Sequence, residues 1–108
     1  MNDFTITEML DMQERLQEKY KGKWEAITPD AAKNKLLWMI GEIGEVIDII
    51  KKNGARKATE SNGIRQALVE EMADVLMYYS DVMLCCGITA EELKNAYVEK
   101  FERNMVRW

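Results

Sequence analysis

The chain has 108 residues, of which 47% are apolar and 31% are charged, and its net charge is −4. This length fits one domain with a modest hydrophobic core, so we expect residues 1–108 to form a single domain. The negative charge and the lack of a long basic run argue against a DNA or RNA partner, because polyanion binders neutralise phosphates with clustered Lys and Arg.

The first element expected in the chain is an amphipathic helix. Residues 1–4 lack the basic start and the apolar stretch of a signal peptide, which favours a cytoplasmic protein. Thr5 and Glu8 then fit a capping box, and apolar residues recur at spacings of three and four up to about Tyr20. We therefore expect a helix over residues 5–20.

A second and longer helix is expected over residues 28–52. Thr28 supplies a capping hydroxyl, Pro29 suits the first helical position, and Gly54 follows the end. Acidic residues interrupt its apolar stretch, so it does not fit a membrane span. The polar segment 53–63 is expected to be the longest loop.

The second half of the chain predicts two more helices, over residues 64–86 and 89–108. Gly87 separates them, and Thr89 with Glu92 forms a second capping box. No segment alternates with the period of a strand, so the fold class is all-α, with a four-helix bundle-like protomer. The two middle helices are apolar around most of their circumference. We therefore expect a partner subunit to cover them in a homodimer or homotetramer.

Each middle helix carries two acids three residues apart: Glu42 and Glu45, then Glu71 and Asp74. This spacing puts each pair on one helix face, and side-by-side packing would bring four carboxylates together. Acids at this spacing usually form a solvated face, but both pairs here have mostly apolar flanks. Crowded carboxylates repel one another unless a cation neutralises them, and oxygen ligands suit Mg²⁺, with Mn²⁺ as the alternative. The absence of histidine argues against a di-iron site.

Two glycines beside the first acidic pair, Gly41 and Gly44, need an explanation, because glycine costs a helix about 1 kcal/mol relative to alanine. Close packing of a neighbouring helix is one explanation. Room for a ligand or a metal-bound water is the other, and the sequence leaves both open.

At these residues the chain resembles the MazG-like all-α nucleoside triphosphate pyrophosphohydrolases. That superfamily carries Glu-x-x-Glu on one helix and Glu-x-x-Asp on the next, which here are residues 42–45 and 71–74, with 25 residues between them. Residues 100–108 resemble the family's trailing Lys-x-x-x-Asn-x-x-Arg-aromatic element. The resemblance runs from about the second helix to the end, and three motifs in order make it fairly specific.

The resemblance implies an enzyme that cleaves a nucleoside triphosphate to the monophosphate and pyrophosphate, in a helical dimer or tetramer. Its Mg²⁺ ligands would be Glu42, Glu45, Glu71 and Asp74. Either Glu42 or Glu45 would take the proton of the attacking water. The contacts to the triphosphate would be Lys100, Asn104 and Arg107. Without the acidic motifs, these basic residues would be interpreted as complementing the helix dipole.

Aromatic residues near the acids are candidates for stacking on the base of the nucleotide. Trp38 and Tyr78 each lie one helical turn from an acid, although an aromatic residue on an apolar helix is more often part of the core. Trp38 is the leading candidate, with Tyr78 and Trp24 behind it. Asp81, two turns beyond the second acidic pair, is a candidate for an outer-shell group.

Two rival interpretations stay open. A related enzyme would use the same motifs on dUTP, dCTP or phosphoribosyl-ATP, and only a panel of substrates distinguishes it. A non-catalytic helical module would use the acids to bind metal or nucleotide for regulation, or only for assembly. In that module, Glu42→Gln and Asp74→Asn would leave any activity unchanged.

Overall fold

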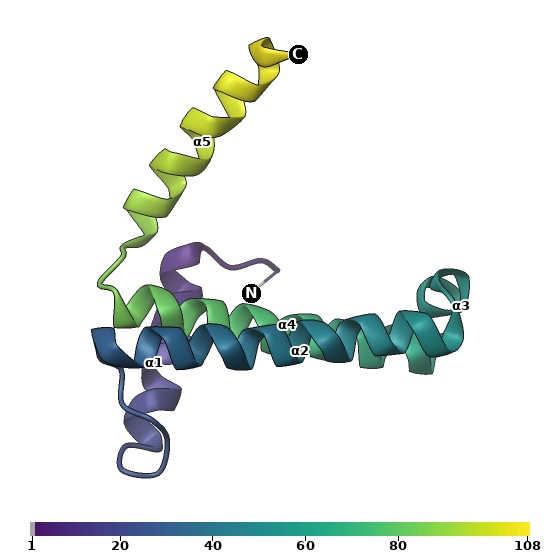
Figure 1. The fold of residues 1–108 in the computed structure, drawn as a ribbon, viewed down its shortest axis with the longest axis horizontal. Coiled ribbons are helices and arrows are strands. Elements are labelled where there is room, and N and C mark those ends of the chain that lie inside the picture. Colours follow the sequence, from purple (N-terminus) through teal and green to yellow (C-terminus); the bar gives the residue numbers. More distant parts are fainter. Residues whose placement is uncertain (1) are drawn as a thin grey trace.

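The computed structural model describes residues 2–108, which form an assembly of helices (Figure 1). The elements in chain order are α1 (Ile6–Lys19), the short 3₁₀ helix η1 (Pro29–Ala31), α2 (Ala32–Asn53), α3 (Ala55–Glu60), α4 (Asn62–Cys85) and α5 (Ala90–Arg107). No strand occurs among the described residues, which confirms the all-α class. In this part of the chain, no helix combines the length and the apolar character that crossing a membrane requires.

Both expected capping boxes form. At the start of α1, the backbone N–H of Glu8 donates to Thr5 Oγ1 over 3.1 Å, and the N–H of Thr5 donates to the Glu8 carboxylate over 2.8 Å. Thr89 and Glu92 make the equivalent pair before α5, over 3.1 and 3.0 Å. Each box satisfies backbone donors that have no partner within the helix, so it fixes where the helix begins.

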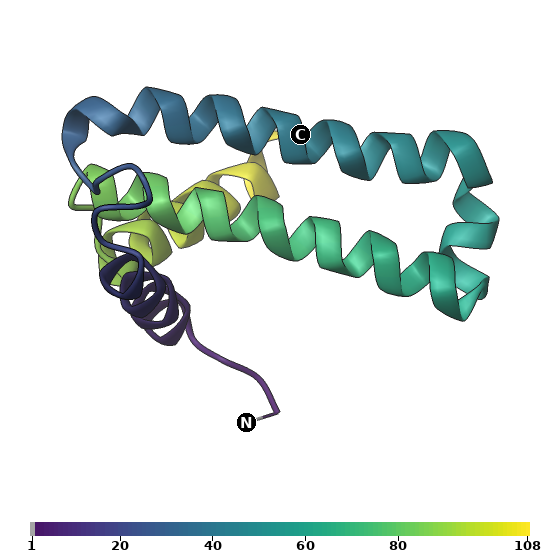
Figure 2. The same cartoon turned by 90° about the horizontal axis from the view of Figure 1, so that it is seen from below.

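The long helices α2 and α4 lie side by side and run in opposite directions, joined at one end by α3 (Figure 2). Gly54, at φ +83°, ends α2 as expected. The prediction of a loop over residues 53–63 is wrong, because Ala55–Glu60 form α3 and α4 already begins at Asn62. The polar composition of this segment is typical of a loop, so the sequence did not indicate the helix. It packs against both long helices and leaves Ala58 only 1% exposed.

The small core lies where α1 crosses the C-terminal half of α4 (Figure 2). Leu10 of α1 is buried, as are Met83 and Cys85 of α4 and Ala31 of η1. Four polar or charged residues are buried as well: Gln13, Lys35, Ser80 and Asp81. A core of this size leaves most of the apolar surface of the two long helices uncovered.

Helix α5 departs from the expected four-helix bundle. Gly87, at φ +65°, turns the chain after α4, and α5 then projects away from the α2–α4 pair and contacts only α1 among the described helices (Figure 1). The radius of gyration is 16.2 Å, whereas a compact chain of this length would have roughly 13 Å. A single chain therefore forms a helical hairpin crossed by α1, and its last helix has no long-helix partner.

Candidate active site

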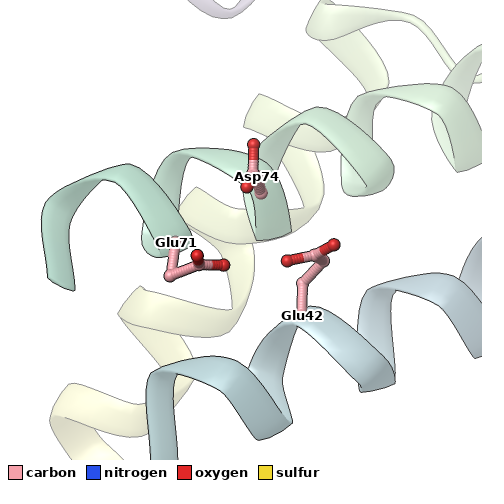
Figure 3. A group of neighbouring side chains, drawn as sticks. All are labelled: Glu42, Glu71 and Asp74. Carbon is pink, nitrogen blue, oxygen red and sulfur yellow. The ribbon is translucent and has the colours of Figure 1, made fainter. Parts of the chain in front are cut away.

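Three of the four predicted acids meet between the two long helices. Glu42 projects from α2 toward α4, the facing helix, which carries Glu71 and Asp74 (Figure 3). One carboxylate oxygen from each residue lies within 4.8 Å of the others, and all three side chains are half-buried. Because every candidate ligand atom is a carboxylate oxygen, the group fits a hard divalent cation such as Mg²⁺ or Mn²⁺.

The pKa of Glu42 is raised above its ordinary value of 4.5. Burial between the helices is the largest cause, followed by a hydrogen bond with the Glu71 carboxyl group. The negative charges of Asp74, Glu71 and Glu45 act in the same direction. The metal-free cluster therefore holds a proton more readily than an isolated glutamate does, and a bound cation would relieve the same repulsion.

Glu45 does not join this group. It lies on α2 one turn after Glu42 and is exposed, and no oxygen of its carboxylate falls within the cluster of the other three acids. Its charge still reaches the cluster, because it contributes to the raised pKa of Glu42. The structure thus places Glu45 at the edge of the acidic site.

A pocket of about 320 Å³ opens directly beside the acids. Its lining residues are Gln13, Leu16, Gln17, Trp24, Glu25, Lys35, Trp38, Asp74, Met77, Tyr78 and Asp81. Asp74 belongs to both the pocket and the acidic cluster, so the two are continuous. Trp38, Tyr78 and Trp24, the three aromatic candidates, all line this pocket. The pKa of Tyr78 is raised, first by burial and then by the charges of nearby acids, Glu42 foremost.

The end of the pocket near α1 is polar and was not anticipated from the sequence. Gln13 Nε2 donates to Asp81 Oδ1 over 2.9 Å, and Gln17 Nε2 donates to the two Asp81 oxygens over 3.1 and 3.2 Å. Lys35 Nζ lies 3.4 Å from Asp81 Oδ2, with both side chains almost fully buried. Asp81, expected as an outer-shell group of the metal site, instead anchors this cluster. The available signal was a pair of glutamines one turn apart on α1, next to its apolar stripe.

A family model for the MazG nucleotide pyrophosphohydrolase domain matches residues 31–105. This match covers more than half of the chain and includes all four predicted acids. The chain belongs to the MazG family. Neither the curated proteins nor the solved structures gave a match. Membership in the MazG family points to a hydrolase of the nucleotide pyrophosphohydrolase type.

The C-terminal basic residues of this MazG chain lie apart from its acids. Lys100, Asn104 and Arg107 line a hollow on α5 together with Arg103 and Trp108. The Arg107 guanidinium lies 4.9 Å from the centroid of the Trp108 ring, a cation–π distance. Because α5 contacts neither α2 nor α4, a single chain does not bring these expected phosphate contacts to the acidic cluster.

Proposed function

We propose that this MazG protein is a Mg²⁺-dependent nucleoside triphosphate pyrophosphohydrolase that releases a nucleoside monophosphate and pyrophosphate, in the role of cleaning the nucleotide pool. One observation carries the proposal: three carboxylates from two helices converge, and one of them, Asp74, also lines a pocket with aromatic walls. A triphosphate substrate needs both features, a cation site for its phosphates and an apolar slot for its base. Because such substrates occur in the cytoplasm, the proposal places the protein there, with residues 1–108 acting as one domain.

The metal would be held by Glu42, Glu71 and Asp74, with Glu45 at the edge of the site able to complete the ligand set. When bound, Mg²⁺ or Mn²⁺ would neutralise phosphate charge and make water a stronger nucleophile. The fit rests on the donor set, which consists of carboxylate oxygens from three residues within 4.8 Å of one another. A cation relieves the repulsion among such carboxylates, which in the metal-free cluster adds to burial in raising the pKa of Glu42.

Within this site the protein groups have separate tasks. Glu42 would take the proton of the attacking water if its carboxylate faces the water and does not bind the metal directly. Glu45 is the alternative acceptor, since it lies one turn away and is exposed. Trp38 would cover the base, as its side chain lines the pocket next to the acids.

The phosphate contacts require a second copy of the chain. Lys100, Asn104 and Arg107 would neutralise charge on the leaving pyrophosphate, but α5 does not reach the acids of its own chain. Large apolar side chains of α5 and α2 are exposed. On α2 they recur at spacings of four and three, in Leu36, Ile40, Ile43, Ile47 and Ile50. That spacing is the pattern of a helix–helix seam, which supports a homodimer or homotetramer in which α5 of one copy covers the long helices of another.

The test is product analysis with Mg²⁺ and a panel of ribonucleoside and deoxyribonucleoside triphosphates, in water enriched in ¹⁸O. The proposal predicts monophosphate and pyrophosphate, with the label in the monophosphate, because water attacks the α-phosphorus. Inorganic phosphate and diphosphate would refute the proposed cleavage position. No cleavage with either Mg²⁺ or Mn²⁺ would favour a non-catalytic binding module.

Matched variants make the test specific to the acidic cluster. Glu42→Gln and Asp74→Asn should each abolish turnover while the far-ultraviolet circular dichroism stays unchanged. Glu70→Gln is the control, because Glu70 lies on α4 with Asp74 but is exposed and outside the cluster. Equal losses in all three variants would mean that the cluster has no special role.

A further inference from the structure

The polar end of the pocket has a fixed pattern of hydrogen-bonding groups. A carboxylate such as Asp81 can only accept hydrogen bonds, so the amides of Gln13 and Gln17 must both turn their nitrogens toward it. Their oxygens therefore face away from Asp81. Within residues 2–108, no donor of the chain hydrogen-bonds either glutamine oxygen. The two amides are thus presented as unpaired acceptors.

The group that orients these amides is itself held in place. The side chain of Asp81 is 3% exposed and pairs with Lys35, which also donates to the backbone oxygen of Glu25 over 3.4 Å. Gln13 is buried as well. A buried ion pair with hydrogen bonds to both partners resists rearrangement, because any movement would leave a charge without a partner. The acceptors are therefore preorganised before any ligand enters.

The remaining walls suit a flat ring. Trp24, Trp38 and Tyr78 line the pocket, and the Trp24 ring stacks on Tyr20 with a centroid distance of 4.4 Å. The volume of about 320 Å³ lies within the range of small-molecule sites. Asp74 connects this slot to the acidic cluster, so a nucleotide with its phosphates at the acids would have its base in the pocket.

We propose that this pocket receives the nucleobase and selects cytosine and adenine by their exocyclic amino group, with the Gln17 side-chain oxygen accepting an N–H of that group and Gln13 supporting it. The inference rests on the proposed function and specifies its substrate class. Cytosine and adenine carry an amino group where uracil and hypoxanthine carry a keto oxygen. A keto oxygen facing the glutamine oxygens leaves both acceptors unpaired in a partly buried pocket, which is unfavourable.

The first test compares matched substrates in the wild-type protein. The values of kcat/KM for CTP against UTP, and for ATP against ITP, should favour the amino-bearing member of each pair by about tenfold or more, as expected for one discriminating hydrogen bond. Equal values, or a preference for the keto members, would overturn the inference while leaving the hydrolase proposal intact. This comparison needs no variant to fold.

The second test assigns the preference to one side chain. Gln17→Met keeps the size of the side chain and removes the acceptor, so kcat/KM for CTP should fall toward the value for UTP, and UTP itself should change little. Gln66→Met is the control, because Gln66 is exposed on α4 and lies outside the pocket. An undiminished preference in a folded Gln17→Met protein would exclude Gln17 as the selecting group.

A binding measurement separates this inference from the hydrolase proposal. Trp24 and Trp38 line the pocket, so their fluorescence should report nucleotide entry. With analogues that carry a methylene group between the α- and β-phosphates, the cytidine compound should bind about tenfold more tightly than the uridine compound. This result in a protein that hydrolyses nothing would support the pocket and refute the enzyme. No binding of either analogue would refute the pocket as a base site.

Discussion

The carboxyl groups of Glu42, Glu71 and Asp74 repel one another when no cation is bound, and this repulsion has a measurable consequence. Mg²⁺ should raise the midpoint of thermal unfolding by mass action, because the unfolded chain does not hold the three acids together. Asp74→Asn should raise the midpoint of the metal-free protein and remove most of the gain from Mg²⁺. Thermal unfolding with EDTA or with millimolar Mg²⁺ measures both effects. If Mg²⁺ still raised the unfolding midpoint of Asp74→Asn by the same amount, the metal would bind elsewhere.

The raised pKa of Glu42 predicts a pH dependence of stability in the metal-free protein. The folded protein binds this proton more tightly than the unfolded chain, where the pKa is near 4.5. The resulting stabilisation is fully present below that value and is lost as the pH rises through the higher pKa of the folded protein. Urea unfolding in EDTA at a series of pH values above 4 should show this loss, and Glu42→Gln should reduce it. A steeper loss of stability with rising pH in Glu42→Gln would contradict the assignment of this pH dependence to Glu42.

The buried ion pair of Lys35 and Asp81 predicts a large effect of a single substitution. Lys35→Met leaves the Asp81 charge without its cation, which should lower the free energy of unfolding by about 3–5 kcal/mol. Urea denaturation at neutral pH measures the change. The matched control is Lys33→Met, on the same helix but exposed. If Lys35→Met and Lys33→Met have the same free energy of unfolding, the buried Lys35 stabilises the protein no more than an exposed lysine does.

Sequence patterns predicted the acidic residues better than their surroundings. The Glu-x-x-Glu and Glu-x-x-Asp motifs placed Glu42, Glu71 and Asp74 on facing helix sides, because helical spacing fixes which residues share a face. The spacing did not place Glu45, whose side chain lies at the edge of the contact. Gln13 and Gln17 were not predicted as pocket residues, for a different reason. Their partner, Asp81, is more than sixty residues away, and only tertiary packing brings it to α1.

At the scale of helices, local signals determined the ends and tertiary contacts determined the rest. Capping boxes at Thr5 and Thr89 and the glycine at 54 were visible in the sequence and were confirmed. Helix α3 was missed, because a six-residue helix has little intrinsic stability and depends on packing against the hairpin. The direction of α5 was missed as well, since no pattern within α5 records which other helix it contacts.

The burial of Ala58 makes the stability of α3 testable. Ala58→Glu places a charge where the native side chain is 1% exposed, so α3 should detach from the end of the hairpin. Hydrogen exchange should then show faster exchange of the amides in Ala55–Glu60, while the core around Met83 stays protected. Thr59→Glu, at the exposed neighbouring position, should leave the exchange of α3 unchanged. Equal protection in both variants would mean that Ala58 does not hold α3 in place.

For the whole molecule, the elongated shape and the uncovered seam on α2 require a common explanation. A Cβ atom added at Gly41 or Gly44 would meet no atom within 4 Å, so packing inside one chain does not account for these glycines. Close approach of a second copy would account for them, and it would also cover the apolar residues beside them. The open space around Gly41 and Gly44 therefore favours the packing explanation, with a partner subunit as the packed element.

Self-association is therefore the prediction on which the complete site depends. Sedimentation at micromolar concentration should show a dimer or tetramer, and Ile40→Glu, at a position 61% exposed in the single chain, should shift it to the monomer. Lys33→Gln is the control, because Lys33 lies on the same helix, is exposed, and its replacement also changes the net charge by one unit. If Ile40→Glu loses turnover together with assembly while it keeps its fold and its rise in unfolding midpoint with Mg²⁺, that result would indicate that the phosphate contacts come from α5 of another copy. A wild-type monomer with full activity would contradict this assembly, and α5 would then have to move onto the acids of its own chain during the reaction.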